Sequence, residues 1–147
     1  MANVDDVAAY ILEQHGPMTA WKLQKLVYYA QAWNLVWEDT PLFREPILAW
    51  ANGPVCPALY AHHRGKFEVS PPWRDGNSVD VADDERESID VILQSYGDKS
   101  AQWLSDLTHA EPPWQEARVG LANSERGNRE ITHNAMAEYY GTLASAD

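Results

Sequence analysis

The fold is decided mainly by residues 18–60, which read MTAWKLQKLVYYAQAWNLVWEDTPLFREPILAWANGPVCPALY. The stretch begins as an aromatic-rich amphipathic pattern that contains Lys22 and Lys25, and it passes through an acidic loop into a short β-like run. The corner Asn52-Gly53-Pro54 then forces a turn, and Pro57 follows where the first residue of a helix tolerates proline. Bulky apolar groups and rigid turns specify one packed arrangement, and the stretch holds no motif of a known catalytic site. The pattern therefore indicates recognition rather than chemistry.

Local patterns along the chain predict a compact, mainly α single domain over residues 1–147, a helical bundle of about six helices with a minor short β element. Apolar residues at helical spacing predict a first helix from Val4 to the break at Gly16-Pro17. Thr19 is suited to cap a second helix that runs to about Trp37. Other helical patterns cover residues 58–64, 80–96, 100–107, 112–118 and 132–143, and strand patterns cover residues 46–51 and 66–69.

The second helix has two predicted faces. Its apolar face predicts a buried stripe made of Leu23, Leu26, Val27, Ala30 and Trp33 or Trp37. Lys22, Lys25 and Tyr29 share the neighbouring face by three-and-four spacing. We expect these lysines to form a solvated face or to pair internally, and the alternative is a contact with a phosphate or an acidic partner.

Charge and cysteine content limit the classes of partner and compartment. The formal net charge is −11, and residues 74–147 carry fifteen Asp or Glu against six Lys or Arg. Such acidity argues against nucleic acid or an anionic membrane as the main partner, and it suits solubility or docking onto a basic protein. A single cysteine, Cys56, excludes an internal disulfide and fits a reducing cytoplasm. No secretion signal and no apolar run of about 20 residues is present, so we expect a cytoplasmic protein.

The sequence predicts no metal site, no cofactor and no catalytic residue. His62 and His63 are adjacent, so on a helix their side chains diverge by roughly 100° and are poorly placed to share one ion. Cys56 is expected to pack as a small apolar group, although a nucleophilic pair with a distant histidine is the alternative. Neither a phosphate-binding glycine loop nor a serine-hydrolase motif occurs.

Residues 107–114, LTHAEPPW, pack polar and aromatic groups between two expected helices. One hypothesis makes His109 and Glu111 an acid/base pair or a binding contact. The favoured hypothesis makes Thr108 and His109 a bracket that satisfies free carbonyls at a helix end, with Trp114 filling the core.

The tryptophans and the acidic segment 80–90 are the candidate recognition surface. Core packing is expected for Trp33 and Trp50, whereas partial exposure is expected for Trp21, Trp37 and Trp73. The acidic segment is expected to form a charged, solvated helix face, and the alternative is mimicry of nucleic acid. The candidate residues for contact with a protein partner are Trp21, Trp37, Trp73, Asp83, Asp84 and Glu87.

Three blocks together resemble the Panacea domain of the SocA-like antitoxins, which also include phage-associated proteins of the GepA type. Residues 22–33 resemble the signature helix KLQKLLYYAQ, residues 41–60 resemble a block that reads PLF, AW, GPV, P and LY, and residues 108–114 resemble a block that reads TH, E and PW. The resemblance extends over residues 4–143. The matching motif residues are Lys22, Leu23, Gln24, Lys25, Tyr28, Tyr29, Trp50, Gly53, Pro54, Val55, Tyr60, Thr108, His109, Glu111, Pro113 and Trp114.

The resemblance implies an antitoxin of a toxin–antitoxin or phage-defence pair. Such a protein neutralises a cognate protein toxin, encoded by an adjacent gene and typical of a prophage, by direct stoichiometric binding. A homo- or hetero-oligomer is expected as one form of the protein. Most motif residues are expected to build the scaffold. Two alternatives remain open: a DNA-binding transcriptional regulator, with a helix-turn-helix around Gly16-Pro17, and a small hydrolase or transferase that uses His109 and Glu111.

Overall fold

The central element of the computed structural model, which describes residues 2–145, is helix α2 (Ala20–Glu38). Thr19 caps it as expected, because its hydroxyl accepts a hydrogen bond of 3.2 Å from the backbone N–H of Lys22. The helix ends at Asp39, which adopts the left-handed conformation with φ 59°. Side chains are buried around nearly the whole circumference of α2, not only on the predicted stripe.

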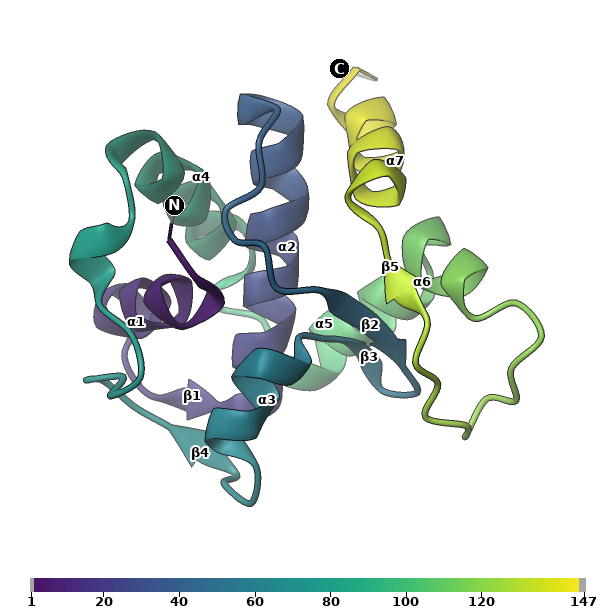
Figure 1. Ribbon diagram of the computed structural model, residues 1–147, viewed down its shortest axis with the longest axis horizontal. Coiled ribbons are helices and arrows are strands. Elements are labelled where there is room, and N and C mark those ends of the chain that lie inside the picture. Colours follow the sequence, from purple (N-terminus) through teal and green to yellow (C-terminus); the bar gives the residue numbers. More distant parts are fainter. Residues whose placement is uncertain (1, 146–147) are drawn as a thin grey trace.

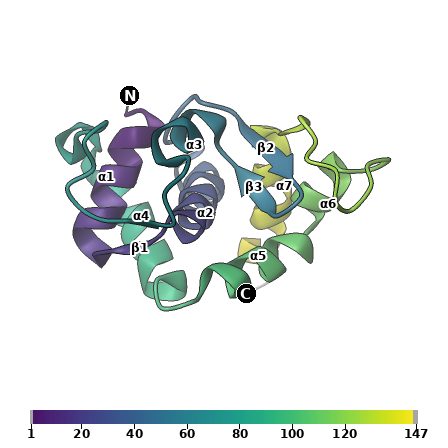
Figure 2. The same ribbon diagram turned by 90° about the horizontal axis from the view of Figure 1, so that it is seen from below.

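The remaining helices surround α2, which Figure 2 shows almost along its axis. Helices α1 (Val4–His15) and α4 (Asp83–Tyr96) lie on one side, and α4 follows a short 3₁₀ turn, η1 (Ser78–Asp80). Helices α5 (Ala101–His109), α6 (Pro112–Ala117) and α7 (His133–Ser145) lie on the other side, and α3 (Pro57–His63) packs near the first turns of α2 (Figure 1). Over the described residues, seven α-helices with short strands confirm the mainly α prediction.

Two small antiparallel sheets connect these helices. Strand β1 (Met18–Thr19) pairs with β4 (Glu68–Val69), which lies within the predicted segment 66–69. The second sheet has the order β3-β2-β5, with β2 (Ile47–Trp50) in the centre between β3 (Gly53–Val55) and β5 (Glu130–Ile131). The sequence did not predict β3, because Gly53-Pro54 is typical of a turn, nor β5, because two residues are too few to show alternation.

The core joins all helices around α2. Its largest fully buried side chains include Tyr28, Tyr29 and Tyr140. None of the helices within residues 2–145 has the length and hydropathy that crossing a membrane requires.

Candidate functional site

Two glutamines of α2 hold the chain segments that pass beside it. The side-chain oxygen of Gln24 accepts a 2.9 Å hydrogen bond from the backbone N–H of Cys56, and its nitrogen donates to the Cys56 carbonyl at 3.2 Å. The side chain of Gln31 binds the segment before strand β2 in a similar way. Its oxygen accepts a 2.7 Å hydrogen bond from the backbone N–H of Leu42, and its nitrogen donates to the Phe43 carbonyl at 2.8 Å. Both amides are buried, so their polar groups need these partners. The two motif blocks at residues 41–43 and 53–57 are therefore fixed by α2.

The two tyrosines of the motif helix and one from α7 surround Glu111. The hydroxyls of Tyr29 and Tyr140 donate to the same Glu111 oxygen at 2.7 and 2.8 Å, and the Tyr28 and Tyr140 hydroxyls are 3.0 Å apart. Burial raises the pKa of Glu111, an effect that the two tyrosine hydrogen bonds oppose. Burial also raises the pKa of all three tyrosines, so they are neutral donors at physiological pH. This cluster ties α2, α7 and the start of α6 together.

Lys25 is buried, so the expectation that it forms a solvated face is wrong. Its ammonium donates to the Pro54 carbonyl at 3.2 Å and lies 5.5 Å from the centre of the Trp21 ring. Burial lowers the pKa of Lys25 to about 7. Gly53 has φ 121°, and a Cβ there would lie 2.6 Å from the Cε of Lys25. The glycine of the motif is needed because the lysine passes directly against it.

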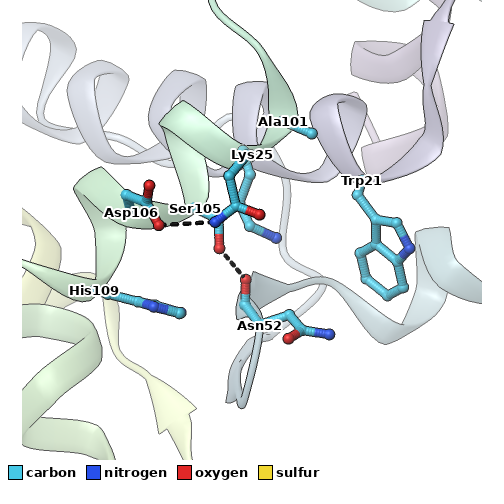
Figure 3. Close-up of a pocket in the computed structure, with 8 residues that line it drawn as sticks. Trp21, Lys25, Asn52, Ala101, Ser105, Asp106 and His109 are labelled. Carbon is cyan, nitrogen blue, oxygen red and sulfur yellow. Dashed lines mark hydrogen bonds between the residues drawn. The ribbon is translucent and has the colours of Figure 1, made fainter.

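Lys25 also lines a cavity of about 350 Å³ between α2, α5 and the β2–β3 turn, which we call the Lys25 pocket (Figure 3). Two hydrogen bonds fix its rim: the Ser105 hydroxyl donates to the Asn52 carbonyl at 2.7 Å, and the Gln102 amide donates to the Asp106 carboxylate at 2.8 Å. The residues that line it are Trp21, Lys25, Asn52, Ala101, Gln102, Ser105, Asp106 and His109.

His109 and Glu111 do not form an acid/base pair in the described chain. The His109 ring stacks on Trp114 with centroids 4.1 Å apart and faces the Lys25 pocket, whereas the Glu111 carboxylate is bound by the tyrosines. Thr108 donates to the Ser105 carbonyl at 2.7 Å, and the Trp114 indole donates to the Trp50 carbonyl at 2.8 Å. The favoured hypothesis therefore holds for Thr108, which donates to a helix carbonyl, and for Trp114, which packs against the core. Its assignment of His109 to a free carbonyl is wrong, because the Nε2 atom of His109 has no hydrogen-bond partner among the described residues.

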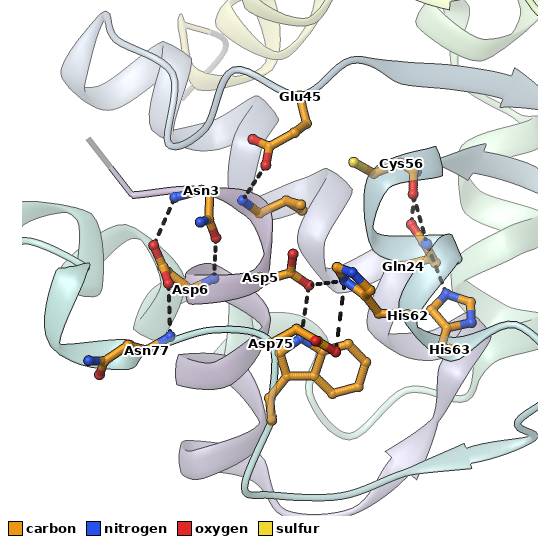
Figure 4. A network of polar contacts seen from close by, with 12 residues as sticks. Asn3, Asp5, Asp6, Gln24, Glu45, Cys56, His62, His63, Asp75 and Asn77 are labelled. Carbon is orange, nitrogen blue, oxygen red and sulfur yellow. Dashed lines mark hydrogen bonds and ion pairs between the residues drawn. The ribbon is translucent and has the colours of Figure 1, made fainter.

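A second polar network lies at the start of α1 (Figure 4). One Asp5 oxygen accepts hydrogen bonds from the indole of Trp73 and the ring of His62, both at 2.9 Å. The hydrogen bond to Asp5 raises the pKa of His62. Trp73 is only 7 % exposed, so the expected partial exposure of this side chain is wrong. His63 turns the other way, toward the Gln24 amide at 3.0 Å, so the two adjacent histidines diverge as predicted.

The described residues form neither a reactive cysteine, nor a metal site, nor a basic face for DNA. Cys56 is free and buried, and burial raises its pKa to about 11, so the thiol is not activated. Within residues 2–145, no three His, Cys, Asp or Glu side chains are grouped to hold a metal ion. Helix α2 offers no basic face to DNA, because Lys25 is buried and the Lys22 ammonium donates to the Gly97 carbonyl at 2.6 Å.

An exposed apolar groove lies where α2, α4 and α7 meet, and we call it the Trp37 groove. Trp37, Val91 and Leu143 are 42 %, 42 % and 40 % exposed, so three large apolar side chains are exposed together at this one groove. Glu87 is exposed one turn before Val91 on α4, and Asp83 and Asp84 are exposed at the start of this helix. The groove is lined by Trp33, Trp37, Val91, Ile92, Ser95, Tyr96, Leu143 and Ala144.

The sequence did not single out Arg118, which organises the loop between α6 and β5. Its buried guanidinium donates to the carbonyls of Ala49 at 2.7 Å, Ala122 at 2.9 Å and Arg126 at 3.0 Å, and also to that of Glu125. An arginine satisfied by carbonyl oxygens leaves no charge pattern in the sequence, so no signal pointed to it. Gln31 was also missed, although its position seven residues after Gln24 places both amides on one face of α2.

Comparison with known proteins gives one match. The family model described as "Antitoxin SocA-like, Panacea domain" matches residues 23–115, which cover all three blocks except Lys22. No curated protein and no solved structure matches the chain. The match covers more than half of the chain and contains the contacts of Gln24, Gln31 and Lys25 and the hydrogen bond from Tyr29 to Glu111, whereas Tyr140 lies outside it. The chain belongs to the SocA-like antitoxin family that is defined by the Panacea domain.

Proposed function

We propose that this protein is an antitoxin that neutralises a cognate protein toxin, encoded by an adjacent gene, by direct stoichiometric binding in the cytoplasm, with residues 1–147 acting as one domain. The observation that carries the proposal is membership of the antitoxin family. The geometry supports a binding role, because the polar residues of the motif are used internally and the His109–Glu111 pair is not formed. The motif therefore describes the scaffold, and the toxin is selected by the surface.

We further propose that the toxin docks on the Trp37 groove. Exposed aromatic and aliphatic side chains form its floor, and such groups supply most of the energy of protein interfaces. Exposed Glu87, one turn before Val91, and exposed Asp83 and Asp84 in the first turn of α4 make this helix acidic, which suits a basic surface of the toxin and accelerates encounter. Of the candidate contact residues from the sequence, Trp37 and the three acidic residues belong to the proposed docking surface. Trp73 is buried and Trp21 lines the Lys25 pocket, so neither belongs to it.

Co-expression with the product of the adjacent gene tests the antitoxin role. The neighbouring protein should arrest growth alone and be harmless when this protein is present. A neighbour that is harmless alone, or equally toxic in both cases, rejects the proposal.

Two matched valine variants test the docking surface. Val91→Arg places a charge and a long side chain in the Trp37 groove and should abolish protection. Val119→Arg changes an equally apolar side chain that is 68 % exposed outside the groove, and it should protect like the wild type. Equal protection by both variants rejects the groove as the toxin site while leaving the antitoxin role intact.

A further inference from the structure

The Lys25 pocket has no part in the proposed docking of a toxin, and its wall contains a buried ammonium that has no carboxylate partner among the described residues. The Lys25 ammonium has three N–H donors, and one hydrogen bond, to the Pro54 carbonyl, is present. Within residues 2–145, no Asp or Glu oxygen lies within 4.0 Å of this ammonium. A cation held in a cavity wall with a single neutral acceptor is costly, and an arriving anion lowers that cost.

A second polar atom at the same cavity lacks a partner. The Nε2 atom of His109 is buried and makes no hydrogen bond with the described residues. Buried polar atoms almost always have a partner, so an isolated one beside a cavity points to a missing ligand or water. Burial and the nearby Lys25 lower the pKa of His109, so the ring is neutral and its Nε2 is a donor in one of its two tautomers.

We propose that the Lys25 pocket binds the carboxylate of a small organic acid or of a polypeptide end. The carboxylate oxygens accept hydrogen bonds from the Lys25 ammonium and from His109 Nε2, and the apolar body of the ligand lies against the Trp21 ring. The cavity of about 350 Å³ suits a ligand at the small end of the usual range of roughly 300–1,000 Å³.

The rim of the pocket sets the charge of the ligand. The Asp106 carboxylate lies at the rim and is held there by Gln102. A cavity with one buried ammonium in its wall and one carboxylate on its rim favours a monoanion, because a dianion such as a phosphate monoester would meet stronger repulsion from Asp106. This selectivity distinguishes the pocket from a phosphate site, which typically offers an arginine fork or several backbone N–H groups.

Benzoate and its neutral analogue benzamide test the proposal on the full chain. NMR titration at pH 6.5, where the Lys25 ammonium predominates, should show a saturable shift of the Trp21 indole signal with benzoate. Benzamide should bind at least about tenfold more weakly, the loss expected for a charge-assisted hydrogen bond. Equal affinity for the two compounds, or no saturable shift with benzoate up to about 10 mM, overturns the proposal.

Two variants assign the effect to the pocket. Lys25→Met should weaken benzoate at least about tenfold, and Asp106→Asn should strengthen benzoate several-fold while leaving benzamide unchanged. If Lys25→Met does not fold, the Asp106→Asn result decides, and equal effects on both compounds overturn the proposal.

The peptide Gly-Gly-Phe and its C-terminal amide separate the two sources of the carboxylate. Binding of the peptide acid but not of its amide assigns the pocket to a chain end. Binding of benzoate alone assigns it to a free organic acid.

Discussion

Replacing Lys25 by methionine tests whether a buried, unpaired ammonium destabilises this fold. Burial lowers the pKa of Lys25 from 10.5 to about 7. At about 1.36 kcal/mol per pKa unit, with the folded lysine half deprotonated at pH 7, burial costs about 4 kcal/mol at that pH. Methionine has a similar length and no charge, but it leaves the Pro54 carbonyl without its donor, which costs about 1–3 kcal/mol. Lys25→Met should therefore stabilise the protein by about 1–3 kcal/mol at pH 7.

The same variant predicts a pH dependence with a defined sign. Between pH 7 and 10.5 the unfolded lysine binds more protons than the folded one, so the stability of the wild type rises with pH in this window. By pH 9 the cost of burying Lys25 falls to about 2 kcal/mol, so the stabilisation by Lys25→Met should shrink by about 2 kcal/mol. The buried tyrosines and Cys56 titrate equally in both proteins, and their contributions cancel in the difference.

Urea unfolding of both proteins at pH 7 and pH 9 measures this difference. Lys66→Met is the control, because Lys66 is exposed and its removal should change stability by less than about 0.5 kcal/mol at both pH values. Parallel stability changes for the wild type and Lys25→Met between the two pH values would refute the reasoning, because they would mean that Lys25 titrates as it does in water.

Three further substitutions test the internal contacts of the motif by urea unfolding. Gln24→Leu should cost about 1–3 kcal/mol, because it leaves the buried backbone N–H of Cys56 without an acceptor, although the Cys56 carbonyl keeps its bond from the Tyr60 N–H. Gln102→Ala on the surface should change stability by less than about 0.5 kcal/mol. Glu111→Leu should cost about 2–4 kcal/mol because two buried tyrosine hydroxyls lose their acceptor, and a neutral result would contradict the cluster. Gly53→Ala should cost more than about 2 kcal/mol because of the positive φ and the contact with the Lys25 side chain; a cost below 0.5 kcal/mol would contradict that contact.

Local signals in the sequence predicted the helices well. Thr19, Gly16-Pro17 and Pro57 mark helix ends through interactions within one turn, so the helices appear close to their predicted positions. Strands β3 and β5 were not predicted, because both are formed by pairing with β2 and neither shows a local strand pattern.

The environment of the polar motif residues was not predictable from spacing. Lys25 shares a face with Lys22 and was expected to be solvated, but strand β3 covers it and its ammonium donates to Pro54, 29 residues later. Tyr140 lies 111 residues after Tyr29 and meets it at the same Glu111 oxygen. Trp73 was expected to be partly exposed, but its indole donates a hydrogen bond to Asp5, 68 residues earlier, and is buried there. In each case a partner distant in the sequence decides burial, and no local pattern reports it.

Titration of the purified toxin with this purified protein tests the central claim most directly. Stoichiometric neutralisation predicts that toxin activity falls linearly to zero at a fixed molar equivalence, without dependence on incubation time. Toxin activity that persists in excess protein, or that declines with time at substoichiometric amounts as under an enzyme, would contradict it.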